Sequence, residues 1–330
     1  MILLKRILLA CAALLLFALA ALTACGQSDE VAPDVIINMA VLPGVSSLGA
    51  LWLMDAAENG ETENAYNIEI VGSPEEIPPH IVRGTMDIAA VPTNLASILY
   101  NQTDGGVRVL ALSTLGVLHL VDTTGEVHSI ADLRGKTVHL SGMGAAPEFA
   151  FSYVLRQNGL EPGIDVFLEF HAMQPQIAAL LEQGVAEIAL LPEPFATTVL
   201  MNNANARHAL DLSVEWQRVQ PDYALVMTAI IVRTEFLEEH PAAVAAFMRD
   251  FERSINFVNT NVAEAAELAV KFDLIPNVNI ATQTIPRSNQ VFIAGERMRR
   301  YMHGYLAVLY AQLPASVGGA LPDEDFYFSN

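Results

Sequence analysis

Four short turns of the sequence carry the residues whose types are best suited to hold a small polar molecule. The turns span residues 43–47, 92–94, 142–146 and 192–195. Each turn follows an apolar run typical of a strand and precedes a run typical of a helix. Unpaired N–H groups at the helix starts should therefore lie at the carboxyl ends of the strands, where open α/β sheets bind ligands. The ligand contacts that we predict in these turns are Ser46, Ser47, Thr93, Asn94, Gly142, Met143, Gly144, Ala145, Glu193 and Phe195.

Several of these side chains have a structural alternative. Ser46 and Ser47 can donate their hydroxyls to a ligand, and either can equally serve as a helix N-cap. The same two roles are open to Thr93 and Asn94. Glu193 can accept hydrogen bonds from a ligand amine or act as a plain carboxylate at a helix start.

Two phrases one hundred positions apart indicate how the turns are arranged. Residues 86–96 read MDIAAVPTNLA, residues 186–196 read AEIALLPEPFA, and Gly84 and Gly184 precede them at the same offset. Around each phrase, short β-like runs alternate with longer helix-like runs, which is typical of parallel sheets. The sequence therefore predicts an α/β fold with two lobes, whose turns face one shared cleft.

Two long β-rich runs connect the predicted lobes. Residues 107–122, with Gly116 near the middle, are long enough to leave one sheet and reach the other, and residues 223–236 form a second such run. We expect the two runs to form a two-strand hinge and count Gly116 among the candidate ligand contacts. The predicted lobe 1 spans residues 35–118 and 226–330, and lobe 2 spans residues 119–225.

A helix is predicted after the second β-rich run. Pro241 suits a first helical turn, and the apolar residues Val244, Phe247, Phe251 and Ile255 recur at three- and four-residue steps. We expect this helix and the helices that follow it to pack on lobe 1.

The start of the chain predicts export. Lys5 and Arg6 precede an almost wholly apolar run over residues 7–22, as in a secretory signal peptide. The letters Leu22-Thr23-Ala24-Cys25 then resemble the lipobox of bacterial lipoproteins. That resemblance implies removal of residues 1–24, lipidation of Cys25 and a tether over residues 25–34, which would attach the protein to a membrane. An uncleaved membrane helix is the alternative, although the apolar run is at the short limit for a span.

The charge of the chain limits the kinds of partner it can bind, and its cysteine content limits the disulfides it can form. The chain has 17 basic and 37 acidic residues and a net charge of −20, which is poorly suited to phosphate backbones. We therefore expect no nucleic-acid partner. Cys11 lies inside the predicted signal peptide, so a lipidated Cys25 leaves the exported protein without a disulfide.

Longer phrases resemble the solute-binding proteins of ABC importers. They include GTMDIAAVPTNLASILY, TEFLEEHPAAVAAFMRDF and SIADLRGKTVHLSGMGAAPEFAFSYVLRQNGLEP, in which DLRGKTV before a small-residue turn is the most specific. The sequence is similar to the cluster of sulfonate-, nitrate- and thiamine-precursor-binding proteins over nearly all of residues 35–330. This resemblance implies a type II periplasmic-binding fold, hinge closure around a small molecule, and docking on a membrane permease with its ATPase.

The turns depart from those of anion-binding relatives. The hydroxyl residues usual in the third turn of the relatives are replaced here by Met143, Ala145 and Ala146. None of the four turns contains lysine or arginine, although a sulfonate or nitrate is better held with cationic or hydroxyl groups. Phe195 can supply a flat apolar wall, or it can belong to the core. We therefore expect a neutral or weakly basic organic ligand such as a nitrogen heterocycle, with a sulfonate- or nitrate-type anion as the alternative.

Enzymatic and metal-binding functions have weaker support. Residues 142–147 match a dinucleotide fingerprint only in part, because Pro147 stands where the third glycine belongs. The turn at Ser46 lacks the spacing of a nucleophile elbow. The eight histidines are scattered and no cysteine pair exists, so we expect no catalytic residue, cofactor or metal site. An enzyme built on the same fold and a sensor that signals through a partner are the alternatives.

Overall fold

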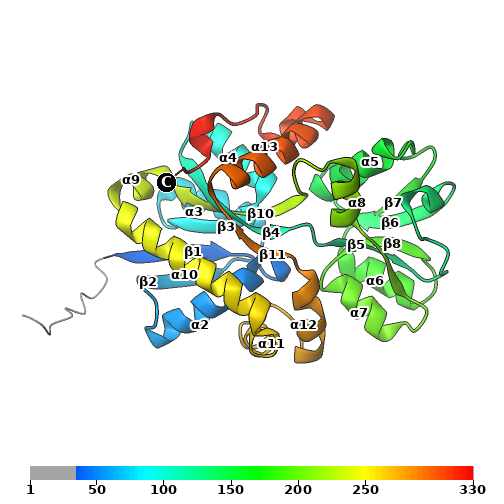
Figure 1. Ribbon diagram of the computed structural model, residues 1–330, viewed down its shortest axis with the longest axis horizontal. Helices are drawn as coiled ribbons and strands as arrows, with labels where there is room; N and C mark the ends of the chain where they lie inside the picture. The colour runs from blue at the N-terminus through cyan, green and yellow to red at the C-terminus, as the bar shows by residue number, and fades with distance from the viewer. Residues whose placement is uncertain (1–34, 330) are drawn as a thin grey trace, which may run out of the picture. The chain divides into compact units, whose positions relative to one another are not determined.

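The structure is a computed structural model that describes residues 35–329 as two β-sheets with helices between their strands (Figure 1). The first sheet has the strand order β11-β4-β10-β3-β1-β2, and the second has the order β7-β6-β8-β5-β9. The α/β class predicted from the sequence is confirmed. The predicted signal peptide, Cys25 and the tether lie outside the described residues.

The strands of the first sheet come from both ends of the described chain, and those of the second come from its middle. The first sheet contains β1 (Ile36–Val41), β2 (Ala65–Ile70), β3 (Ile88–Pro92), β4 (Val107–Leu115), β10 (Val226–Arg233) and β11 (Gln290–Ile293). The second sheet contains β5 (Leu118–Asp122), β6 (Thr137–Ser141), β7 (Phe167–His171), β8 (Ile188–Pro192) and β9 (Arg207–Asp211).

Helices connect the strands within each sheet. Those next to the first sheet in sequence are α2 (Leu51–Asn59), α3 (Ile77–Arg83), α4 (Thr93–Gln102), α9 (Thr234–Glu239), α10 (Pro241–Thr260), α11 (Val262–Lys271), α12 (Val278–Thr284) and α13 (Gly295–Gln312). Those next to the second are α5 (Ala146–Gln157), α6 (Gln174–Glu182), α7 (Phe195–Asn202) and α8 (Leu212–Val219). Short 3₁₀ turns are η1 (Val45–Ala50), η2 (Pro74–Glu76), η3 (Ile130–Leu133), η4 (Ile285–Arg287), η5 (Pro314–Val317) and η6 (Glu324–Phe326).

The helix predicted at Pro241 is confirmed as α10, which begins at that proline. Its buried side chains include Val244, Phe247, Phe251 and Ile255, so the spacing read from the sequence gives the face that meets the core. The same cluster of apolar side chains contains residues of β1, β3 and β10. The helix therefore covers one face of the first sheet.

The two echoed phrases fold alike. Gly84 and Gly184 follow α3 and α6 with φ angles of 69° and 70°, in the left-handed region that glycine adopts without steric cost. Strands β3 and β8 follow, each ends at a proline, and the pattern of burial over residues 91–100 repeats over residues 191–200. The repeat in the letters is therefore a repeat in local structure.

The first β-rich run crosses between the sheets as predicted. Strand β4 belongs to the first sheet and β5 to the second, with Gly116 between them. Strand β10 runs antiparallel to β4, and Val226 at its start pairs with Leu115 at the end of β4. The two connections between the sheets therefore leave the first sheet side by side.

Aromatic side chains close one side of the junction between the sheets. Trp216 of α8 is fully buried, and its ring centroid lies 5.7 Å from that of Tyr305 on α13 and 4.9 Å from that of Tyr153 on α5. The Trp216 Nε1–H donates to the carbonyl of Tyr223 at 3.0 Å. Because α13 follows the first sheet and α8 the second, these contacts join the two lobes through a common apolar core.

Candidate functional site

A cavity of about 620 Å³ lies where residues of the two lobes meet. Its volume falls within the range of about 300–1,000 Å³ that is usual for small-molecule sites. Two of the four predicted turns line it, one from each lobe. The lining residues most important here are Pro43 and Gly44 from lobe 1, Pro194 and Phe195 from lobe 2, and Leu274 and Ile280 near α12.

The first turn places one of its two serines inside the protein. Ser47 is 1% exposed, and its hydroxyl donates to the carbonyl of Leu42. Ser46 is half-buried, and within the described residues no hydrogen bond of its side chain is found. Gly44, which lines the cavity, has a φ of 86° and leads the chain from β1 into η1.

The second turn is bonded to lobe 1. Thr93 is buried and its hydroxyl donates to the carbonyl of Val226 at 3.1 Å, while Asn94 Nδ2 donates to the carbonyl of Ser316 at 3.3 Å. Both acceptors belong to lobe 1. In this structure the two side chains fasten α4 to β10 and to the C-terminal segment.

Gly116 lies at the crossing between the sheets. Its carbonyl accepts hydrogen bonds from Ser213 Oγ at 3.0 Å and from Asn289 Nδ2 at 2.6 Å, so it has one donor from each lobe. A Cβ atom at this position would lie 2.3 Å from Ser213 Oγ and 2.8 Å from a methyl group of Leu225. The crossing therefore has no room for a side chain.

The third turn meets a carboxylate of its own helix. Gly142 is half-buried, and Met143 and Gly144 are exposed, with Met143 72% exposed. The N–H of Gly144 donates to Glu148 Oε2 at 2.6 Å, in the first turn of α5. Ala145 is half-buried and precedes the first residue of the helix. This helix start therefore already holds one negative charge, which opposes the binding of an anion there.

The fourth turn leads to Phe195, which forms part of the cavity wall, and contains the buried carboxylate of Glu193. Phe195 is half-buried and lines the cavity, whereas Glu193 is 2% exposed. Glu193 accepts hydrogen bonds from the backbone N–H of Thr197 at 3.1 Å and from its hydroxyl at 3.0 Å. The carboxylate thus caps α7, while Pro194, the next residue, borders the cavity.

Two histidines lie against Glu193. Oε1 of Glu193 is 4.0 Å from His119 Nε2 and 3.7 Å from His208 Nε2, and the two imidazole rings meet edge to face with centroids 4.8 Å apart. His119 comes from β5 and His208 from β9, strands that neighbour each other in the second sheet. Within the described structure, His119 Nε2 and both ring nitrogens of His208 are buried without a hydrogen-bond partner. This cluster therefore has unused donors and acceptors.

Burial sets the protonation of the cluster. It lowers the pKa of His208 to about 4, with the charges of His119 and Arg287 acting in the same direction. It also lowers the pKa of His119, against the charge of Asp211, and it raises the pKa of Glu193 against the hydrogen bonds from Thr197. Both imidazoles are therefore neutral at pH 7, and their contacts with Glu193 are not ion pairs at that pH.

The sequence did not single out His119 or His208, because they lie far from the turns in the chain and only strand pairing brings them to Glu193. It also did not predict Leu274, which lines the cavity from the connection between α11 and α12, or Ile280, which lines it from α12. Alternation along β9 gave no signal for His208, because the pairing of β9 with β5 is shifted between Leu210 and His208.

Comparison with protein families identifies the chain. The model of a family described as NMT1/THI5 like matches residues 67–265, which include both echoed phrases and the second sheet. The chain belongs to the NMT1/THI5-like family. A comparison of this chain with curated proteins found no match.

Solved structures of similar fold include binding proteins of transport systems. An ABC transporter protein from Parabacteroides distasonis superposes with a TM-score of 0.75 and 22% identity, over 90% of this chain and 99% of that one. The periplasmic aliphatic sulphonate binding protein SsuA from Escherichia coli gives a TM-score of 0.68 and 11% identity, over 89% and 92%. The periplasmic nitrate-binding protein NrtA from Synechocystis gives 0.60 and 15%, over 87% and 85%. This NMT1/THI5-like protein has the type II periplasmic-binding fold, as predicted.

Over the residues that the structure describes, no helix is both long enough and apolar enough to span a membrane.

Proposed function

We propose that this NMT1/THI5-like protein is the solute-binding component of an ABC import system. It captures a small organic molecule between its two lobes and delivers it to a membrane permease and its ATPase. The observation that carries the proposal is the cavity at the junction of the lobes, lined by Pro43 and Gly44 on one side and Pro194 and Phe195 on the other. A ligand held by both lobes stabilises the closed arrangement, because it makes its full set of contacts only there.

The chemistry of the site favours a neutral or weakly basic ligand. Among the described residues that line the cavity, none is lysine or arginine, and most are apolar. Glu182 lines it and accepts a hydrogen bond from Asn202 Nδ2 at 3.0 Å, and the buried Glu193 lies one residue from the wall. The third turn, where an anion would bind backbone N–H groups, already bonds Glu148. Carboxylates and a flat Phe195 suit a nitrogen heterocycle better than a sulfonate or nitrate.

The predicted lipid anchor completes the proposed function. Attachment through Cys25, after removal of residues 1–24, would keep the binding protein close to its permease. The net charge of −20 agrees with an exported protein that binds no nucleic acid. Labelling of cells with a radioactive fatty acid would test the anchor, since label should enter the wild type and be lost from Cys25→Ala.

A thermal-shift screen tests the ligand class directly. The purified protein is heated in the presence of pyrimidines, other vitamin precursors, amines, alkanesulfonates and nitrate. A ligand at 100 times its dissociation constant should add about 2.7 kcal/mol to the free energy of unfolding, which gives a clear rise in Tm. We expect a heterocyclic base among the hits. A rise with sulfonates or nitrate alone would contradict the proposed ligand class and leave solute binding itself intact.

A further inference from the structure

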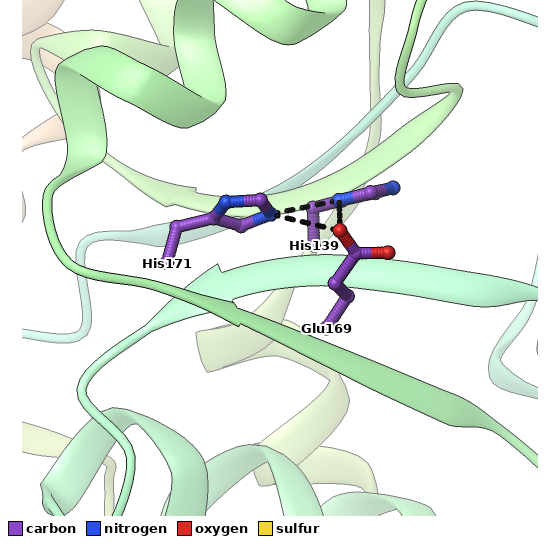
Figure 2. Close-up of side chains that lie close together, drawn as sticks. All are labelled: His139, Glu169 and His171. Atoms are coloured by element: carbon purple, nitrogen blue, oxygen red, sulfur yellow. Dashed lines mark hydrogen bonds and ion pairs between the residues drawn. The ribbon is translucent and has the colours of Figure 1, made fainter.

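Three metal-ligating side chains meet on the second sheet, in a place the predicted function does not use. His139 lies on β6, and Glu169 and His171 lie on β7 (Figure 2). His139 Nδ1 is 3.0 Å from His171 Nε2, and Glu169 Oε1 is 3.7 Å from His139 Nδ1 and 3.6 Å from His171 Nε2. Figure 2 shows the three side chains pointing toward one another.

The strand pairing accounts for this arrangement. Glu169 and His171 are two residues apart on β7, so their side chains leave the same face of the sheet. Strands β6 and β7 are parallel, and His139 is the register partner of Glu169. The side chain of His139 therefore rises beside that of Glu169, within reach of the imidazole of His171. Sequence spacing alone could not reveal this, because β6 and β7 are separated by α5.

The distances fit the first shell of a transition-metal ion. A tetrahedral Zn²⁺ ion bound at about 2.0–2.2 Å by imidazole nitrogen and carboxylate oxygen requires ligand atoms about 3.3–3.5 Å apart. The three observed separations, 3.0, 3.6 and 3.7 Å, lie on both sides of that value. Only small side-chain movements are needed for all three atoms to reach one ion.

The surroundings give the cluster both rigidity and access. The side chains of His139 and His171 are 11% and 9% exposed, so packing holds the imidazoles in place. The side chain of Glu169 is 57% exposed, and β7 is an edge strand of its sheet. An ion can thus enter from solvent on the side of Glu169, and water can occupy the remaining coordination position.

We propose that His139, Glu169 and His171 bind a divalent transition-metal ion of the Zn²⁺ type. Two imidazoles with one carboxylate favour such an ion over Mg²⁺ or Ca²⁺, which prefer oxygen ligands only. The bound ion would link edge strand β7 to β6 and so stabilise lobe 2.

This site is separate from the proposed solute site. The cavity at the lobe junction is lined by other residues, including Ala178 and Phe195, and the His119–His208 pair adjoins Glu193 instead. Metal binding and solute binding can therefore be tested independently.

Calorimetric titration with ZnCl₂ tests the proposal. The purified full-length protein, freed of metal with a chelator, should bind one equivalent of Zn²⁺. Because Glu169 is exposed, Glu169→Ala should leave the fold intact and weaken binding by at least about tenfold, as should His171→Ala. His128→Ala, which removes an exposed histidine outside the cluster, is the matched control and should leave the affinity unchanged.

A second measurement covers the case in which a variant folds poorly. Saturating Zn²⁺ should raise the Tm of the wild type and of His128→Ala, but not that of Glu169→Ala. Unchanged affinity in Glu169→Ala and His171→Ala, the absence of a wild-type Tm rise, or a loss of binding confined to His208→Ala would overturn the proposal. The last result would place the ion at the Glu193 cluster instead.

Discussion

The segments 88–102 and 188–202 share one local structure and differ in what their turns contact. Each has a strand that ends at a proline and is followed by a helix, with the same pattern of burial over residues 91–100 and 191–200. The helix begins directly at Thr93 in the first segment and at Phe195, after two turn residues, in the second. Thr93 and Glu193 occupy matching positions and are each 2% exposed. Thr93 bonds Val226 within lobe 1, whereas Glu193 lies against two histidines whose ring nitrogens have unused capacity.

The difference in contacts suggests different roles for the two turns, and we propose that only the turn at Glu193 takes part in ligand binding. A buried hydroxyl with one good acceptor is a structural fastening, and its removal costs stability. A buried carboxylate beside neutral imidazoles is costly to keep unless it has a further role, because burial disfavours its charge. We therefore propose a structural role for the turn at Thr93 and ligand contact for the turn at Glu193.

The largest expected effect is on ligand affinity when Glu193 is made neutral. Glu193→Gln keeps the shape and the oxygen that caps α7, but it loses the charged acceptor for a ligand N–H. A hydrogen bond to a charged group contributes about 1.5–3 kcal/mol, so the affinity for the heterocycle should fall about 10- to 100-fold in calorimetry. Thr93→Val is the matched control, and an equal loss of affinity in that variant would erase the distinction between the turns.

Phe195 and Leu95 form the next matched pair, each two residues beyond the matched positions. Phe195 lines the cavity, and Leu95 packs against the apolar core. Phe195→Ala should weaken ligand binding about tenfold, because an aromatic wall of the site is lost. Leu95→Ala should leave the affinity unchanged and lower the free energy of unfolding by about 1–2 kcal/mol, as measured in urea. If Leu95→Ala weakened ligand binding and Phe195→Ala did not, the ligand would contact the first turn and not the second.

The Glu193 cluster should also make stability sensitive to acid. The pKa of His208 is about 4 in the folded protein and 6.5 ordinarily. The contribution of this buried, neutral imidazole to the free energy of unfolding is therefore complete above pH 6.5 and is lost as the pH falls toward 4. The raised pKa of Glu193 acts in the opposite sense, with a contribution that is lost as the pH rises through its folded value.

His208→Gln isolates the histidine from the carboxylate. The difference in unfolding free energy between wild type and variant should change by about 1 kcal/mol or more between pH 7 and pH 4.5, in the direction that favours the variant in acid. Chemical denaturation at several pH values measures this. A constant difference across that range would mean that His208 is not kept neutral by burial.

The smallest effect is expected from Thr93→Val. The variant loses the hydrogen bond to the carbonyl of Val226, which should lower the free energy of unfolding by about 1 kcal/mol or less. Urea denaturation measures the change, and solute affinity should stay within about twofold of the wild type. A loss larger than that of Leu95→Ala would show that this turn holds the lobe more firmly than its single bond suggests.

The sequence predicted the sheets and their connection because these depend on local patterns. Alternating β-like and helix-like runs define the strands, the 3.6-residue period places Phe247 and Phe251 inside, and the run around Gly116 is long enough to serve both sheets. The similarity of residues 86–96 and 186–196 predicted matching local structures, because Gly84 and Gly184 adopt the same left-handed conformation before each strand.

The roles of the turn residues could not be predicted from residue type. Ser47 and Thr93 can bond a ligand or a carbonyl of their own lobe, and only the fold brings Leu42 and Val226 to them. His119 and His208 reach Glu193 through strand pairing across most of lobe 2, which leaves no spacing to recognise. His139 and His171 are brought together in the same way.

A crystal structure with the compound that gives the largest thermal shift tests capture between the lobes most directly. If both lobes hold the ligand, its atoms should lie within about 4 Å of both Gly44 in lobe 1 and Phe195 in lobe 2. A ligand that contacts one lobe only, or that lies outside the junction of the lobes, would contradict capture between the lobes.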